Sequence, residues 1–110
     1  MSVPVDLGDL GAEIARFGAT AFLVTAPPGG PPHVVSVGVA LTDGRLMMSA
    51  GRTSRANVEA APAVTLLWPG APGDDYCLLV DGTGAVVADA ETITVDPTGA
   101  ILHRLAGGSA

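Results

Sequence analysis

The chain has 110 residues, which is enough for one domain with one hydrophobic core and argues against two. Apolar residues make up 48% of the sequence and charged residues 15%, so we expect a folded domain rather than a disordered one. The net charge is −6 and there is no lysine, which argues against nucleic acid and anionic membranes as partners. We see no basic region followed by an apolar run near residue 1, and no apolar run close to the roughly 20 residues that cross a bilayer, so we expect a cytoplasmic protein.

The sequence contains one cysteine, Cys77, which excludes an intrachain disulfide and any zinc site built on several cysteines. Its neighbours Tyr76 and Leu78 predict a packing role in a strand. A reactive thiol is the alternative, and it would need an electropositive setting that the sequence does not show. We predict no metal site.

The first predicted element is an amphipathic helix within residues 1–18. Apolar residues recur there at helical spacing, at Leu7, Leu10, Ile14 and Phe17. Asp6 or Asp9 is placed to cap this helix, and Gly18 to end it.

The pattern then changes to that of strands. Strands are predicted at 19–25, 33–41, 46–48, 63–68, 76–88 with a bulge or a turn at 81–84, and 91–95. Prolines make 27–32 a loop, Asp43-Gly44 indicates a two-residue hairpin turn, and a short helix stops at Pro62. Six short strands and two short helices predict an antiparallel barrel or sandwich over residues 19–105, followed by a frayed tail at 106–110.

The strand at 33–41 has two unlike faces. One face carries the bulky residues Val35, Val37, Val39 and Leu41, and the other carries Ser36, Gly38 and Ala40. This pattern predicts a hydrophobic core on the bulky side and a flat partner close to the small side. For Gly38 a bulge or a bend in the strand is an equal alternative.

Residues 49–57 combine hydroxyls, a glycine, two arginines and the start of the short helix. The N-terminus of a helix offers unpaired N–H groups and the positive end of a dipole, and arginine adds charge-assisted donors. The segment therefore predicts a phosphate site. In the alternative, Thr53 or Ser54 simply caps the helix.

Other catalytic patterns are weak. The sequence has no nucleophile elbow, no Walker loop and no dinucleotide-binding fingerprint. His33 and His103 are far apart in the chain, and Asp74-Asp75 has the composition of a solvated turn. We therefore assign no catalytic side chain.

From about residue 19 to 87, the order of elements resembles the FMN-binding split-barrel family related to pyridoxamine 5′-phosphate oxidase. The resemblance rests on HVVSVGVALTDGRLMMSAGRTSRANVEAAPAVTLLWP, beginning at His33, and on YCLLVDGTG, beginning at Tyr76. It implies a mainly β fold: a six-stranded antiparallel split barrel with an N-terminal helix and one short helix after the third strand. It also implies a homodimer with two flavins in the interface.

The resemblance also assigns cofactor contacts to particular positions. It places the flavin ring along residues 33–38, including His33, Val35, Ser36 and Val37. It places the ribityl phosphate near Met48, Ser49, Arg52, Thr53, Ser54 and Arg55. Of the two arginines, Arg55 is the expected phosphate ligand and Arg52 a substitute for a missing basic residue. Tyr76 is expected to reach the flavin of the partner subunit.

The resemblance therefore implies a small FMN-dependent oxidoreductase that acts on a small-molecule substrate by hydride transfer through flavin N5. His33 and Gly38 stand where the vitamin B6 oxidases often carry Arg and Lys, so pyridoxamine phosphate is not the expected substrate. The alternatives are a reductase of the same fold that uses the deazaflavin F420, and a non-catalytic flavin carrier or structural dimer.

Overall fold

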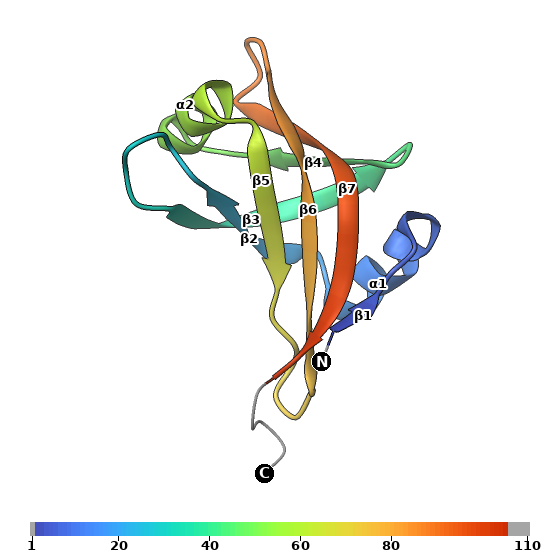
Figure 1. Cartoon of the computed structure of the whole chain (residues 1–110). Coiled ribbons are helices and arrows are strands. Elements are labelled where there is room, and N and C mark those ends of the chain that lie inside the picture. The colour runs from blue at the N-terminus through green and yellow to red at the C-terminus, as the bar shows by residue number, and fades with distance from the viewer. Residues whose placement is uncertain (1, 106–110) are drawn as a thin grey trace.

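A computed structural model describes residues 2–105, and Figure 1 shows the chain as a barrel of long strands. In chain order the elements are β1 (Ser2–Pro4), the 3-10 turn η1 (Leu7–Asp9), α1 (Leu10–Phe17), β2 (Thr20–Thr25), β3 (His33–Thr42), β4 (Arg45–Ser49), α2 (Arg52–Ala60), β5 (Ala63–Trp68), β6 (Tyr76–Val87) and β7 (Thr92–Arg104). Strands β2–β7 are antiparallel neighbours in the order β7-β4-β3-β2-β5-β6, and β6 pairs with β7 to close the barrel. The predicted six-stranded barrel with an N-terminal helix and a helix after its third strand, β4, is confirmed.

The barrel interior is filled by every second residue of each strand. Leu23, Leu66, Val80 and Ile93 are fully buried there. Trp68, at the end of β5, is also fully buried, and its indole Nε1 donates to the carbonyl of Gly18 at 2.9 Å. Gly18 ends α1 with a φ of 103°, as predicted, because this backbone conformation favours glycine. Trp68 thus ties the end of α1 to the core.

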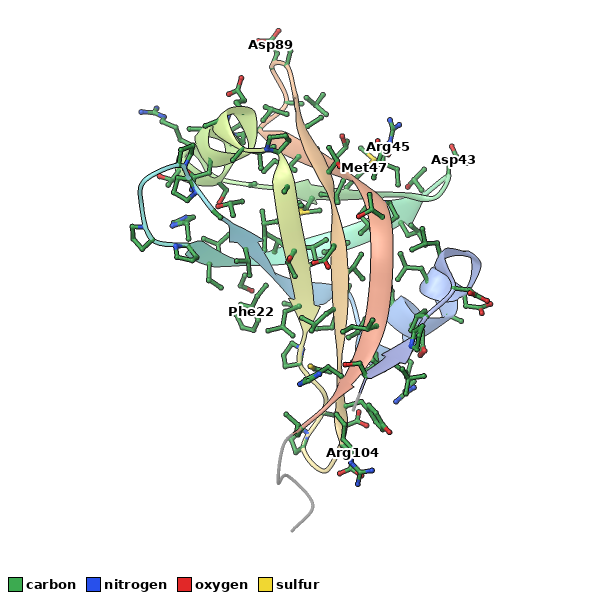
Figure 2. The ribbon with its side chains drawn as sticks, in the orientation of Figure 1. Phe22, Asp43, Arg45, Met47, Asp89 and Arg104 are labelled. Carbon is green, nitrogen blue, oxygen red and sulfur yellow. The ribbon has the colours of Figure 1, made fainter. Side chains whose placement is uncertain are left out.

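The hairpin between β3 and β4 follows its sequence signal. Asp43 and Gly44 both have positive φ, 52° and 77°, and Thr42 pairs with Arg45. Positive φ at both central residues is the geometry of a type I′ turn, whose twist matches that of the flanking strands. Figure 2 shows Asp43 at the exposed tip of this hairpin.

The last hairpin is longer than predicted. β6 runs without a break through 81–84, where Asp81 pairs with Gly99 and Gly82 with Pro97, leaving Thr98 as the extra residue of a bulge. The bulge alternative is therefore right and the turn alternative wrong. The prediction that the last strand ends at Val95 is also wrong, because β7 continues to Arg104.

β7 can extend beyond Val95 because the edge that does not pair with β6 is only partly paired with other strands. β4 pairs with β7 only over residues 92–95, and β1 pairs with it only over residues 101–103. Pro97 falls in the gap between them, where no second ladder needs an N–H from β7. A turn-like sequence is tolerated in a strand at this point.

The N-terminal segment differs from the prediction of helix over residues 1–18. Ser2–Pro4 forms β1, in which Val3 pairs with Leu102, and helix begins only at Leu7. Asp6 and Asp9 stand at the N-cap positions of η1 and α1, as predicted, but neither side chain makes a capping hydrogen bond. The tail predicted at 106–110 lies outside the described residues. Between residues 2 and 105, no helix has the length and apolar character needed to cross a membrane.

Candidate functional site

The barrel is split between β3 and β4. β4 pairs with β3 only from Val39 to Thr42, so residues 33–38 have β2 as their single strand neighbour in the described chain. The N–H of Val39 donates to Ala19, on the β2 side, at 2.7 Å. Because backbone groups of alternate residues point to the same side, those of Val34 and Ser36 face the edge that β4 leaves open.

A depression of about 250 Å³ lies beside this open edge, where β4 ends and α2 begins. It is lined by His33, Val35, Ser36, Val37, Ser49, Ala50, Gly51, Arg52, Thr53 and Ser54. Eight of these were predicted as cofactor contacts from two separate segments of the chain, and the fold brings them together. Whether they bind a cofactor stays a prediction.

The N-terminus of α2 opens into the depression. Gly51 precedes the helix and has no side chain to cap it, and the first turn contains no acidic residue. The first hydrogen bond back from the helix is made by the N–H of Arg55, to Gly51 at 3.1 Å. Thr53 and Ser54 lie inside the helix, so the alternative in which one of them is the cap is wrong. The helix start therefore presents uncapped N–H groups and a positive dipole end.

Ser54 contributes a hydroxyl group to the depression. Its residue is 1% exposed, and its hydroxyl makes no hydrogen bond with residues 2–105. Within the same residues, every side-chain N or O atom that is wholly shielded from solvent has a partner. The hydroxyl of Ser54 must therefore be open to the depression that it lines. By contrast Thr25, the other buried polar residue, accepts a bond from Asn57 at 3.0 Å.

The two arginines of the segment behave differently. Arg52 lines the depression, and its guanidinium has no ion-pair or hydrogen-bond partner among residues 2–105. Arg55 does not line it: its Nε donates to the carbonyls of Ala50, at 3.1 Å, and Gly51, at 3.4 Å. The geometry thus favours Arg52, and not the expected Arg55, as the direct partner of an anion.

Two other predicted contacts lie outside the depression. Met48 is 3% exposed and points into the barrel core from β4. Tyr76 stands at the start of β6, where it pairs with Arg104, and does not line the depression of its own chain. Ala50 and Gly51 are the lining residues that the site prediction missed. The signal that could have found them is their place directly before the helix.

A second hollow of about 380 Å³ continues along the outer face of β3. It includes Gly38, Ala40, Met47 and Ser49, and Ser49 also lines the depression. Gly38 pairs in register with Thr20, and a Cβ added there would meet nothing within 4 Å. Neither a bulge nor a close contact within residues 2–105 requires this glycine, so the predicted alternative of a bulge is wrong.

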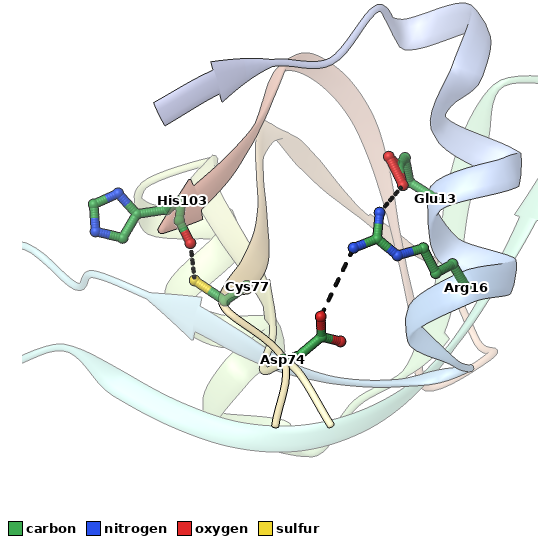
Figure 3. Close-up of polar contacts among 5 residues, drawn as sticks. All are labelled: Glu13, Arg16, Asp74, Cys77 and His103. Atoms are coloured by element: carbon green, nitrogen blue, oxygen red, sulfur yellow. Dashed lines mark hydrogen bonds and ion pairs between the residues drawn. The ribbon is translucent and has the colours of Figure 1, made fainter. Parts of the chain in front are cut away.

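The remaining reactive groups do not gather into a second site. His103 lies at the far end of β7, within 3.2 Å of the Ser2 hydroxyl, so it does not meet His33. Cys77 lies in β6, a strand as predicted, and is half-buried. Its thiol donates to the His103 carbonyl, at 3.6 Å; Figure 3 marks this contact with a dashed line. The described residues contain no group of three or more His, Cys, Asp or Glu side chains that could hold a metal ion.

Another hollow, of about 320 Å³, is lined by residues including Thr65 and Asp81, whose side chains bond to each other at 2.6 Å. It contains none of the predicted site residues.

Comparison with known proteins supports the fold. No protein-family model matches the sequence, and neither does any curated protein. Solved structures do match. One is a protein of Clostridium acetobutylicum related to general stress protein 26 of B. subtilis, of the pyridoxinephosphate oxidase family, with 12% identity, a TM-score of 0.70 and coverage of 91% of both chains.

Two further matched structures have a cofactor in their names. A FAD-binding protein from Mycobacterium smegmatis is 14% identical with a TM-score of 0.65, over 94% of this chain and 99% of that one. An F420 reductase is 17% identical with a TM-score of 0.59, over 86% of this chain and 92% of that one. The chain therefore has the split-barrel fold of flavin-binding proteins, which is the fold that the sequence resemblance implied.

Proposed function

We propose that this protein binds FMN, with the phosphate at the N-terminus of α2 and the flavin ring along the open edge of β3. One observation carries the proposal. An uncapped helix N-terminus, the unpartnered hydroxyl of Ser54 and the unpaired guanidinium of Arg52 all converge on one depression. Each of these is a donor, and none has found an acceptor among the described residues.

A phosphate is the anion that suits these donors. A phosphomonoester offers three oxygens, and the helix start, Ser54 and Arg52 approach the depression as backbone, hydroxyl and charged donors. Ser49 and Thr53 line the same space and add two hydroxyls. A neutral ligand would leave the positive charge of Arg52 without a counter-charge.

The proposed position of the ring is along the strand beside the phosphate site. The backbone groups of Val34 and Ser36 face the open edge, where a flavin could receive and donate hydrogen bonds. The hollow over Gly38 continues the depression through Ser49, and the two volumes, about 250 and 380 Å³, are of the size of small-ligand sites. A flat ring needs the small outer face that Ser36, Gly38 and Ala40 provide.

Bound FMN would supply hydride transfer, and we propose that the protein is a small oxidoreductase acting on a small-molecule substrate. In such a site the cofactor carries the difficult chemistry, while the chain anchors the phosphate and aims backbone dipoles at the ring. No acid or base side chain is demanded, which suits a depression whose titratable lining residues are His33 and Arg52.

We further propose that the protein is a homodimer with the cofactor at the interface. Phe22, Val34 and Met47 are exposed on the outer faces of β2, β3 and β4, next to the hollow over Gly38. An apolar sheet face of this kind is expected to be covered by a partner. Tyr76 lies outside the depression of its own chain, so its expected flavin contact would have to be with that of the partner subunit.

A second candidate is the deazaflavin F420, favoured by the structural similarity to an F420 reductase. The test is the visible spectrum of the purified protein together with mass spectrometry of the ligand released on denaturation. The spectrum of oxidised flavin and the mass of FMN support the first proposal, and a blue-shifted deazaflavin spectrum supports the second. A colourless protein whose melting temperature rises with neither cofactor contradicts both, because a ligand that binds only the folded state must stabilise it.

Enzyme and carrier are separated by one further measurement. NAD(P)H or reduced F420 is mixed with the FMN-loaded protein, and the flavin absorbance is followed with time. Rapid bleaching supports the oxidoreductase. A flavin that neither donor reduces supports a carrier.

A further inference from the structure

We propose that Arg55 is a positioning residue: its side chain aims the backbone N–H of Gly51 into the depression and does not itself touch the phosphate. This inference rests on the proposed function, because it concerns how the same anion site is built. It reverses the role that family resemblance gives to Arg55.

The contacts of Arg55 point away from the ligand. Its side chain is 26% exposed, and its Nε donates to the carbonyls of Ala50 and Gly51. Its Nη2 lies 4.0 Å from a carboxylate oxygen of Glu91, in the turn between β6 and β7. The three residues that line the depression from this helix are Arg52, Thr53 and Ser54, which directly precede Arg55.

Peptide geometry converts these contacts into an effect on the site. In a planar trans peptide the C=O of one residue and the N–H of the next point in opposite directions. Fixing the Ala50 carbonyl towards Arg55 therefore turns the N–H of Gly51 away from it. Fixing the Gly51 carbonyl does the same to the N–H of Arg52, but this carbonyl is held by the backbone N–H of Arg55, at 3.1 Å, as well as by the side chain. Because Gly51 and Arg52 line the depression, the geometry turns both N–H groups to the side of the ligand.

Ala50 is also held through its backbone N–H. The N–H of Ala50 donates to the backbone carbonyl of Glu91 at 3.0 Å. Ala50 is thus bound through its N–H to the β6–β7 turn and through its C=O to Arg55. If the Arg55 side chain were removed, the Ala50 carbonyl would lose its donor and could turn towards the anion, where its negative end would repel it. The Gly51 carbonyl would keep its bond from the backbone N–H of Arg55 at 3.1 Å.

The experiment compares Arg55→Met, Arg55→Lys and Arg52→Met with the wild type. Binding of FMN and of riboflavin, which lacks the phosphate, is measured by flavin fluorescence over a series of salt concentrations. Amide proton shifts of Gly51, Arg52 and Ser54 are followed by NMR as FMN is added. Arg16→Met serves as the charge-matched control, since Arg16 pairs with Glu13 and Asp74 away from the depression (Figure 3).

We expect Arg55→Met to weaken FMN about 10-fold, with the salt dependence of the wild type and unchanged riboflavin binding. The FMN-induced shift of the Gly51 amide should shrink, while those of Arg52 and Ser54 remain, because the backbone N–H of residue 55 still holds the Gly51 carbonyl. Arg55→Lys should behave like Arg55→Met, because a lysine keeps the charge but loses the planar donor geometry. Arg52→Met should instead make the salt dependence shallower, since a direct charge contact is lost.

Three results would overturn the inference alone: FMN affinity unchanged in Arg55→Met, affinity restored by Arg55→Lys, or a salt dependence reduced in Arg55→Met as much as in Arg52→Met. A wild-type protein that binds FMN no better than riboflavin would instead overturn the proposed function and this inference with it.

Discussion

Arg52 occupies a position that is unfavourable in the free protein. It is the first residue of α2, where the helix dipole is already positive and a cation is disfavoured by about 0.3–1 kcal/mol. Its guanidinium has no partner among residues 2–105, although the chain as a whole carries a net charge of −6. The proposed phosphate site would account for a cation at such a place with no partner among the described residues.

Replacing Arg52 with Met should therefore separate binding from stability. We expect FMN to bind 10-fold more weakly or worse, as the loss of a charge-assisted bond of roughly 1.5–3 kcal/mol predicts. Riboflavin binding should not change, and the melting temperature of the ligand-free protein should stay the same or rise slightly. Fluorescence titration and thermal melting measure the two quantities. An FMN affinity equal to that of the wild type would remove Arg52 from the site.

A substitution at Gly38 should likewise separate the effect on flavin binding from the effect on stability. Glycine inside a strand costs roughly 0.5–1 kcal/mol relative to alanine, and no contact or bulge in the described chain requires it here. Gly38→Val should therefore raise the free energy of unfolding by about that amount, because a β-branched residue suits an open strand face. It should weaken FMN and riboflavin alike, since the new side chain would stand where the ring lies. Urea denaturation and fluorescence titration would report both, and a stabilised variant with normal flavin binding would contradict the proposed place of the ring.

At the scale of elements, α2 owes its position to β6. The Gly84 N–H donates to the Pro62 carbonyl at 2.7 Å, just after the helix. Val58 of α2 is 2% exposed, and a Cβ added at Gly84 would come within 3.0 Å of its Cγ1. The depression at the start of α2 thus depends on how closely the helix rests on this strand.

Gly84→Val should move the helix and with it the site. Overpacking typically costs about 1–3 kcal/mol of stability, and we expect FMN affinity to fall as well because the N-terminus of α2 is displaced. Gly44→Ala is the control. Gly44 has a φ of 77° in the β3–β4 turn, so alanine should also destabilise by about 1 kcal/mol, but away from the site. Equal FMN affinity in the two variants at matched stability would show that the packing of α2 on β6 does not hold the site.

The elements that the sequence predicted well are those with local signals. The type I′ turn at Asp43-Gly44, the end of α1 at Gly18 and the alternating face of β3 each follow from a few neighbouring residues. β1 and the long extension of β7 could not be predicted in this way. Their existence depends on which strand lies opposite, as the gap beside Pro97 illustrates.

The candidate site was likewise predictable only where the sequence carries a local signal. The two segments that form the depression were predicted, since each carries its own pattern of small, hydroxyl or basic residues. The roles of the two arginines were not, because Arg55 is turned by Glu91 and by backbone carbonyls, which composition does not reveal. The open edge of β3 likewise depends on where β4 stops pairing.

At the scale of the whole molecule, one outer face of the barrel exposes large apolar side chains that residues 2–105 leave uncovered. Phe22 is 39% exposed, Val34 55% and Met47 38%, and they stand on the neighbouring strands β2, β3 and β4. Figure 2 shows Phe22 and Met47 projecting outward from the sheet.

Phe22→Asp tests whether a second copy covers this face. Phe22 does not line the depression, and its side chain is already partly in solvent, so the fold should tolerate the change. We expect the wild type to sediment as a dimer and Phe22→Asp as a monomer, because burying an unpaired carboxylate in an apolar interface costs far more than a small interface gains. FMN should bind more weakly to the monomer, since the partner subunit's Tyr76 would be lost from the site. Val3→Asp is the matched control: Val3 is equally exposed, at 39%, but lies on β1, away from this face, so that variant should remain a dimer. Analytical ultracentrifugation at several concentrations decides the matter, and a wild type that stays monomeric throughout would rule out the homodimer.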